Sequence, residues 1–187
     1  LSILPSADVY GAFGNSSNVL DSFCDKNQST IAIANINIFV VAVNQAPYIT
    51  TTRSSFTSQV NLDTPVPEFT VEDEDHLELM LVSSFGEDRQ PSITVTMTTK
   101  TGRVSLLYTD GIVFIHGRGK DDVATTFRGP LDKVNKAVKS ATYICRLKDG
   151  CMGGYEDEIT IVVDDEGVRG KGGALTYSTA ISVIISQ

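Results

Sequence analysis

The sequence contains no tryptophan and only two histidines, and its aromatic content is 7%. A sugar-binding surface built on stacked indole rings is therefore not expected, and a histidine-based acid–base pair has few candidates. No stretch approaches the roughly 18 unbroken apolar residues of a membrane span, so we expect no membrane insertion in this segment. The chain begins at Leu1 without a signal peptide, which indicates a processed piece of a longer protein.

Positive charge is also scarce, because 15 lysines and arginines stand against 23 aspartates and glutamates. The resulting net charge of −8 repels phosphate backbones, so nucleic acid is not an expected partner. Divalent cations stay plausible partners. With 187 residues, of which 41% are hydrophobic, the chain is long and apolar enough for one or two folded domains.

The three cysteines suggest one disulfide and one remaining thiol. Cys145 and Cys151 flank the turn-like triplet Lys148-Asp149-Gly150, and a disulfide that closes this loop is reasonable in an oxidising compartment. The alternative is two free thiols in a cytosolic protein. If Cys145 and Cys151 form the disulfide, Cys24 is left over, and it is free or pairs with a residue outside this piece.

Two sequence triplets match the acceptor pattern for N-linked glycosylation. They begin at Asn15 and Asn27 and fall in the same polar stretch. Each triplet alone is weak, because such triplets arise often by chance. Together with the cysteines, they favour an extracellular or cell-surface protein.

The hydrophobic pattern alternates with the period of a β-strand over most of the chain. The longest candidate, Ile31–Val43, is apolar on much of both faces and so needs neighbouring strands and a covering layer. Glycine-containing turns separate the shorter candidates, which predicts an all-β sandwich or barrel. These candidates are Glu78–Ser83, Ile93–Thr98, Val104–Leu107, Val113–His116, Ala124–Phe127, Ala141–Arg146, Glu158–Val163 and Thr176–Ile185.

One segment has helical periodicity instead. Leu131, Val134, Val138 and Ala141 share one stripe, and Pro130 suits the first turn of a helix. We therefore expect one short helix near residues 130–140 that crosses between the sheets. The predicted core comprises Leu79, Leu81, Val95, Leu106, Phe114, Phe127, Val138, Tyr143, Ile161 and Ile184.

A weak internal repeat suggests the domain organisation. Near both ends of the sequence, a strand runs into a loop with two glycines three residues apart, and a longer strand ending in glutamine follows. Residues 1–45 are thus interpreted as the terminal hairpin of a preceding repeat, and residues 46–187 as one complete repeat, with the junction at Ala46-Pro47. Either the parent chain or a neighbouring molecule, by donation of a strand, would complete the first part.

Five motifs follow one another in an order that is similar to a known family. They are Val43-Asn-Gln-Ala-Pro-Tyr-Ile, Phe69-Thr-Val-Glu-Asp-Glu-Asp, Gly102-Arg-Val-Ser-Leu, the segment 127–143 and the glycine-rich loop 165–173. This order over residues 43–187 resembles cadherin-like repeats of giant extracellular adhesins. The resemblance implies an immunoglobulin-like sandwich with an adhesive or structural role. Gln45 departs from the family, which commonly has aspartate at that position.

Clustered carboxylates make calcium a possible cofactor. Residues 63–89 contain nine acidic side chains and the single base Arg89, and calcium prefers six to eight oxygen ligands. The alternatives are a solvated acidic loop, a glycine turn at 117–122 and an Asx-type turn at 164–166. The candidate ligands are Glu72, Asp73, Asp75, Asp121, Asp122 and Asp165.

Neither histidine accompanies a recognisable nucleophile motif, so we do not expect an enzyme. His76 lies in the acidic run, and His116 ends a strand candidate. The favoured function is an extracellular structural or adhesive module of a larger surface or filament-forming protein, a stiff spacer or assembly unit whose partners are neighbouring repeats in a homopolymer or filament. The alternative is a carbohydrate-binding module attached to a receptor or an enzyme, and the absence of tryptophan counts against it.

Overall fold

The computed structural model describes residues 17–21, 32–36, 41, 43–76, 92–167 and 170–187. The chain divides into two compact units, residues 1–43 and residues 44–187. In the first unit, strand β1 (Ser17–Asp21) pairs antiparallel with β2 (Ala32–Ile36). All other described elements belong to the second unit, here called the sandwich unit. Whether residues 1–45 end a preceding repeat stays a prediction.

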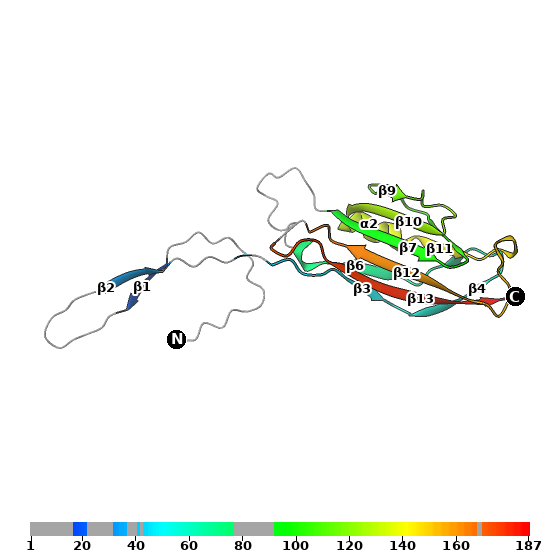
Figure 1. Ribbon diagram of the computed structural model, residues 1–187, viewed down its shortest axis with the longest axis horizontal. Helices are drawn as coiled ribbons and strands as arrows, with labels where there is room; N and C mark the ends of the chain where they lie inside the picture. The colour runs from blue at the N-terminus through cyan, green and yellow to red at the C-terminus, as the bar shows by residue number, and fades with distance from the viewer. Residues whose placement is uncertain (1–16, 22–31, 37–40, 42, 77–91, 168–169) are drawn as a thin grey trace. The chain divides into compact units, whose positions relative to one another are not determined.

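A six-stranded sheet forms one layer of the sandwich unit (Figure 1). Its inner strands alternate strictly in burial, as β7 illustrates: Ile93, Val95 and Met97 are fully buried while the intervening threonines face outward. All neighbouring strands run antiparallel except β4 and β13, which are parallel. The order is β4 (Ser55–Gln59), β13 (Thr176–Ser186), β12 (Glu156–Asp164), β7 (Ser92–Thr99), β10 (Ala124–Pro130) and β9 (Val113–His116).

Two smaller sheets and a helix pack against this layer. One sheet has the order β5 (Thr64–Pro65), β11 (Ala141–Ile144), β8 (Arg103–Leu106), and the other pairs β3 (Tyr48–Thr51) with β6 (Phe69–Glu72). Their inward side chains share one hydrophobic core with the six-stranded sheet. This arrangement of strands around one core, with a short helix, confirms the predicted all-β sandwich.

Helix α2 (Leu131–Lys139) lies where the sequence predicts a helix. Pro130 precedes it with a φ of −55°, and Val134, Ala137 and Val138 are buried against the core. Ala141 is the first residue of β11 rather than part of the helix. Among the described residues, no helix is long and apolar enough to cross a membrane.

The side chain of Asn135 on α2 takes the place of a strand partner for β6. Its Oδ1 accepts a hydrogen bond from the Val71 N–H at 2.8 Å, and its Nδ2 donates to the Val71 carbonyl at 2.9 Å. Because Val71 is buried, these two backbone groups have no access to water. The amide therefore closes this edge of β6 at Val71.

Most of the predicted core is buried, with one error of register. Ile184 is 48% exposed, whereas its neighbours Val183 and Ile185 are buried, because the odd-numbered residues of β13 face inward. Leu79, Leu81 and the predicted strand Glu78–Ser83 lie outside the described residues. Phe114 is partly buried and packs on the core, and the buried predicted residues are Val95, Leu106, Phe127, Val138, Tyr143 and Ile161.

Candidate functional site

The chain enters the sandwich unit at one end of the six-stranded sheet. The backbone N–H of Asn44 donates to the Lys171 carbonyl at 3.2 Å. Its side-chain Nδ2 donates to Asp165 Oδ2 at 2.6 Å and to the Gly173 carbonyl at 2.8 Å. These three partners belong to the loop that joins β12 to β13. Asn44 is therefore fixed to this end, which we call the N face.

The last residues of the chain lie at the opposite end, which we call the C face (Figure 1). The Gly154 N–H donates to the Ile185 carbonyl at 2.8 Å, and the Ile185 N–H donates to the Tyr155 carbonyl at 2.8 Å. Gln187 packs on Gly153. The nine residues of β12 separate these contacts from Asp165. At 3.2–3.4 Å per residue, the two faces lie about 30 Å apart.

Strand β4 lies beside the part of β13 that leads to the C face. The two strands run parallel, with Phe56 opposite Val183 and Ser58 opposite Ile185. The Ser182 N–H donates to the Ser54 carbonyl at 2.9 Å, and the Val60 N–H donates to the Ser186 carbonyl at 3.1 Å. The even-numbered residues of β4 therefore direct their backbone groups at β13, and the odd-numbered residues direct theirs away from it.

Three of the predicted calcium ligands are buried at the N face. Asp165 Oδ1 accepts the N–H groups of Gly167 and Leu175, both at 2.8 Å, while Oδ2 accepts Asn44. Asp75 Oδ2 accepts the backbone N–H of Gln45 at 2.7 Å. These carboxylates thus bind the arriving chain and the β12–β13 loop.

Asp73 is the third buried carboxylate, and it pairs with a histidine. Its Oδ1 accepts the backbone N–H of His76 at 3.1 Å, and its Oδ2 lies 3.2 Å from His76 Nδ1. Glu72 lies at the edge, where it accepts hydrogen bonds from the Tyr48 hydroxyl at 2.8 Å and the Thr50 hydroxyl at 2.9 Å. The bond to Glu72 raises the pKa of Tyr48.

The remaining two predicted ligands lie near the C face and stabilise a turn. Asp122 Oδ2 accepts the backbone N–H groups of residues 118–120 at 2.7 to 3.3 Å. Asp121 Oδ1 lies 2.6 Å from Arg146 Nη2. The six candidates therefore do not form one site. Across the described ranges, no three histidine, cysteine, aspartate or glutamate side chains are grouped to hold a metal ion. Calcium binding stays a prediction.

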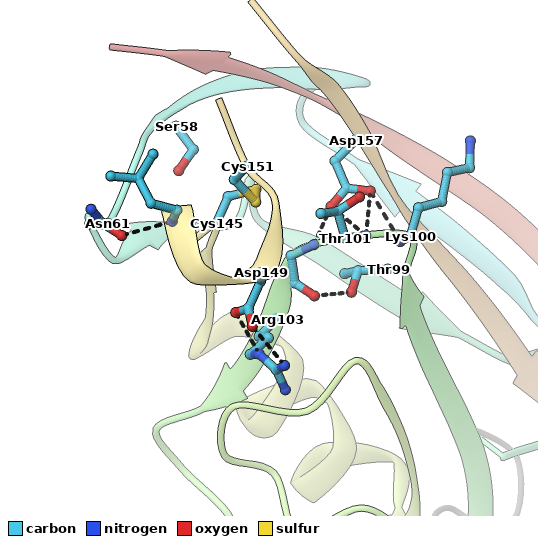
Figure 2. Close-up of a disulfide and its surroundings, with 12 residues drawn as sticks. Ser58, Asn61, Thr99, Lys100, Thr101, Arg103, Cys145, Asp149, Cys151 and Asp157 are labelled. Atoms are coloured by element: carbon cyan, nitrogen blue, oxygen red, sulfur yellow. Dashed lines mark hydrogen bonds and ion pairs between the residues drawn. A yellow bond between two sulfur atoms is a disulfide. The ribbon is translucent and has the colours of Figure 1, made fainter. Parts of the chain in front are cut away.

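The predicted disulfide between Cys145 and Cys151 is confirmed, and it is buried (Figure 2). The two Cα atoms are 5.6 Å apart. The loop between them forms a 3-10 turn, η2 (Leu147–Asp149), which ends at Gly150 with a φ of +92°. Arg103 holds Asp149 from Nε and Nη2 at 2.9 and 3.1 Å, and this bonding lowers the pKa of Asp149. Cys24, Asn15 and Asn27 lie outside the described residues.

The sequence interpretation missed Asp157, which is almost fully buried (Figure 2). Its carboxylate accepts the N–H groups of Lys100, Gly102 and Glu158 at 3.0, 2.7 and 2.8 Å, and the Tyr143 hydroxyl at 2.7 Å. Burial alone would raise the pKa of Asp157, but the hydrogen bonds, from Tyr143 first, lower it. Burial and the bond to Asp157 raise the pKa of Tyr143.

A sequence signal for Asp157 exists. The inward positions of β12 are the odd-numbered ones, and Ile159, Ile161 and Val163 occupy the next three. Asp157 is therefore a charged residue on the apolar face of an alternating strand. A buried carboxylate of this kind needs several donors. Gly102 helps to supply these donors in two ways. Its own N–H donates to Asp157. Because it has no Cβ, which would clash with the Tyr143 ring, the ring lies directly on its backbone and brings the Tyr143 hydroxyl to the same carboxylate.

A shallow groove of about 740 Å³ runs along β4 and β5. Its residues are mainly serine, threonine and proline, with Phe56, Val66 and Ile184. Arg53 is the one titratable side chain among them. Since general acid–base catalysis needs a proton donor or acceptor that titrates, this groove offers no acid–base pair.

Four large apolar side chains are exposed at the C face: Leu62, Leu147, Met152 and Tyr155. They come from the turn after β4, the disulfide loop and the segment before β12. The disulfide loop and the neighbouring turn 117–122 carry the exposed cations Arg118, Lys120 and Lys148 together with the carboxylates Asp121, Asp122 and Asp149.

Comparison with known proteins identifies no family for this chain. No family model and no curated protein match it. A solved structure with some likeness is AggA, the major subunit of aggregative adherence fimbriae type I from Escherichia coli, at 12% sequence identity. The match covers 78% of this chain and 97% of that chain, with a TM-score of 0.37. A likeness at this level supports no statement about function.

Proposed function

We propose that the sandwich unit is a load-bearing structural module of a larger extracellular protein, in which such modules follow one another as spacers or assembly units. One observation carries the proposal. The chain arrives at the N face and its last residue lies at the C face, about 30 Å away along β12. Modules with this geometry add length when they are joined end to end.

The parallel pair β4 and β13 suits such a module to tension. A pull between Asn44 and Gln187 draws β4 towards the N face and β13 towards the C face. The hydrogen bonds between the two strands, from Ser54 to Ser186, are then loaded together along the strand direction. Bonds that share a load must break together, whereas bonds loaded from one end break one after another.

Two further features support an extracellular structural role. The buried disulfide Cys145–Cys151 is typical of proteins from oxidising compartments. The groove along β4 and β5 has no acid–base pair, and no described feature favours the alternative of a carbohydrate-binding module. The resemblance to cadherin-like repeats agrees with a tandem arrangement.

Single-molecule force spectroscopy on the full chain tests the proposal. One protein carries handles at residues 1 and 187, so that tension enters the sandwich unit at Asn44. A second protein carries handles at Lys148, in the η2 turn that binds Asn61, and at Gln187, which packs on Gly153, so both handles lie at the C face. At equal loading rate, the first geometry is expected to need the higher force. Equal or lower force in the first geometry would refute the load-bearing role.

A pair of proline variants isolates the contribution of β4 and β13. Val60→Pro removes the N–H that donates to the Ser186 carbonyl. Gln59→Pro is the matched control, because the N–H of Gln59 points away from β13. Val60→Pro is expected to lower the force in the end-to-end geometry, and Gln59→Pro to leave it nearly unchanged. The same loss from both variants would contradict the assignment of the force to this strand pair.

A further inference from the structure

The segment 145–155, which contains the disulfide and is here called the bridging segment, contacts the ends of both strands of the parallel pair. On the β4 side, Val60 forms a parallel bridge with Cys145, and the Asn61 N–H donates to the Cys145 carbonyl at 2.8 Å. The Leu147 N–H donates to Asn61 Oδ1 at 3.1 Å, and Figure 2 shows Asn61 beside the η2 turn. The first half of the bridging segment is thus bound to the end of β4.

The second half of the bridging segment is bound to the end of β13. The Gly154 N–H donates to the Ile185 carbonyl, and the Ile185 N–H donates to the Tyr155 carbonyl, both at 2.8 Å. Gln187 packs on Gly153 so closely that a Cβ at this glycine would clash with it. β4 and β13 are therefore joined at the C face in two ways, directly by their own hydrogen bonds and indirectly through the bridging segment.

The disulfide determines how far the two halves of the bridging segment can separate. Cys145 belongs to the half that binds β4, and Cys151 precedes the half that binds β13. The two cysteines are six residues apart in sequence, and six residues of extended chain span about 20 Å. The disulfide holds the two Cα atoms at 5.6 Å instead. Without it, the segment can lengthen by about 14 Å.

The strand pair itself fails over a much shorter distance. A shift of β4 along β13 by one residue, about 3.3 Å, already destroys the register of their hydrogen bonds. Besides the disulfide, backbone hydrogen bonds within residues 146–151 and the ion pair of Asp149 with Arg103 hold the loop. When the loop is stretched from its ends, these weaker bonds open one after another. Only the covalent link therefore keeps the bridging segment short during such a shift.

We infer that the Cys145–Cys151 disulfide is a mechanical brace, which couples the ends of β4 and β13 so that the sandwich unit with the disulfide withstands a higher tension than the unit without it. The inference rests on the proposed function, because it concerns the same strand pair and the same direction of pulling. Both cysteines are buried, so thiols in solution do not reach the sulfur atoms of the folded unit. The mechanical strength is thus decided by the oxidation state that the chain acquires when it folds.

Single-molecule unfolding of the full chain at constant force tests the brace. Handles at residues 1 and 187 load the strand pair, and the wild-type protein, purified without reductant, is compared with Cys145→Ala/Cys151→Ala. The double variant is expected to unfold at least roughly tenfold faster at the same force, because β4 and β13 lose their coupling through the bridging segment.

The control variant is Phe114→Ala on β9, at the other edge of the six-stranded sheet. It removes side-chain contacts with the core and leaves the strand pair and the bridging segment unchanged. Because this edge is still folded when β4 and β13 separate, Phe114→Ala is expected to change the unfolding rate under force by less than about threefold.

A second variant keeps the disulfide and removes a contact that the brace needs. Asn61→Gly deletes the oxygen that accepts the Leu147 N–H, and glycine tolerates the φ of +62° at this position. It is expected to unfold faster than wild type under force but more slowly than the double variant, and it decides the question if the double variant does not fold. An unchanged rate in Asn61→Gly, or a double variant that unfolds no faster than Phe114→Ala, would overturn the inference.

Hydrogen exchange without tension gives an independent readout. In the double variant, exchange is expected to accelerate at the amides of Asn61 and Ile185, which donate to the bridging segment. This acceleration should exceed that at the amide of Val71, which donates to Asn135 on the opposite side of the core from the bridging segment's hydrogen bonds. Equal acceleration at all three amides would mean that the disulfide stabilises the unit only as a whole, and the brace would be rejected.

The two proposals fail in different measurements. If the wild-type protein does not need the higher force in the end-to-end geometry, the mechanical role is rejected, while hydrogen exchange still decides whether the disulfide couples the strand ends. If the wild-type protein needs the higher force and the double variant unfolds no faster than Phe114→Ala, the brace is rejected and the mechanical role stands.

Discussion

Asp157 is the residue whose removal should most clearly weaken the sandwich unit without touching its apolar core. Its buried carboxylate accepts hydrogen bonds from three backbone N–H groups at 2.7 to 3.0 Å and from the Tyr143 hydroxyl. A hydrogen bond to a charged group contributes about 1.5–3 kcal/mol, and such contributions within one network are not additive. We expect Asp157→Ala to lower the free energy of unfolding by about 3–5 kcal/mol, because it leaves these donors buried without an acceptor.

The pH dependence provides an independent check on Asp157. Its hydrogen bonds lower its pKa in the folded protein, so the folded state binds this proton less readily than the unfolded state does. The stabilisation is therefore fully present above the unfolded-state pKa of about 3.9 and is lost as the pH falls through the lower folded-state value. Asp157→Asn should remove this part of the acid dependence, so that variant and wild type converge in stability at low pH.

Urea unfolding followed by circular dichroism measures both effects on the full chain. Glu156→Gln is the matched control, because Glu156 is the exposed neighbour of Asp157 on the same strand. A surface change of this kind is expected to stay within about 0.5 kcal/mol. A loss below about 1 kcal/mol for Asp157→Ala at neutral pH would refute the reasoning, because buried donors cost more than that when unpaired. So would an unchanged acid dependence in Asp157→Asn.

Three further predictions concern the core, the disulfide and the edge of β6. Phe127→Ala should cost about 3–5 kcal/mol in urea unfolding, and a nearly unchanged stability would contradict the full burial of Phe127. Replacing Cys145 and Cys151 by alanine should cost about 2–3 kcal/mol, and peptide mapping without reductant should recover the two linked. Asn135→Ala should cost about 1–3 kcal/mol and speed hydrogen exchange at Val71, and unchanged exchange there would argue against the strand-partner role.

The strands that alternate cleanly were predictable from the sequence. Ile93–Thr98 falls within β7 and Glu158–Val163 within β12, and in both strands buried residues alternate with outward-facing ones. In such strands the side-chain period of two by itself decides which residues are buried. The helix was predictable for the same kind of reason, since Val134 and Val138 repeat with the helical period next to Pro130.

The strands β3, β4 and β5 were not predicted as strands, because their residues carry little hydrophobic alternation. β4 reads Ser-Phe-Thr-Ser-Gln and buries mainly Ser58, so its pairing with β13 over a long sequence separation decides its conformation. The error at Ile184 has a different cause. β13 has apolar residues at both 184 and 185, but Ile181 and Val183 already mark the odd-numbered positions as the inward ones, and Ile184 is out of step with them.

The acidic residues were the hardest to interpret from sequence, because one residue type has several structural uses here. Asp122 stabilises a turn, Asp165 binds the arriving Asn44 and Asp157 anchors Tyr143. Spacing along the chain does not distinguish these uses, since Asp165 and Asp157 depend on donors from distant segments, such as Asn44 and Gly102, whereas Asp122 depends on its own turn. The Cys145–Cys151 pair was predictable because both partners and the turn between them are local.

The close approach of Tyr143 to Gly102 has a consequence for how this sequence can vary among relatives. The Tyr143 ring occupies the space of a Cβ at position 102, its hydroxyl binds Asp157, and Asp157 in turn accepts the Gly102 N–H. A side chain at 102 displaces the ring, a shorter residue at 143 leaves a void, and an apolar residue at 157 leaves the backbone donor unpaired. Each single replacement is thus penalised by the two residues that remain. In an alignment of homologous modules, these three positions should covary as a set, present together or replaced together.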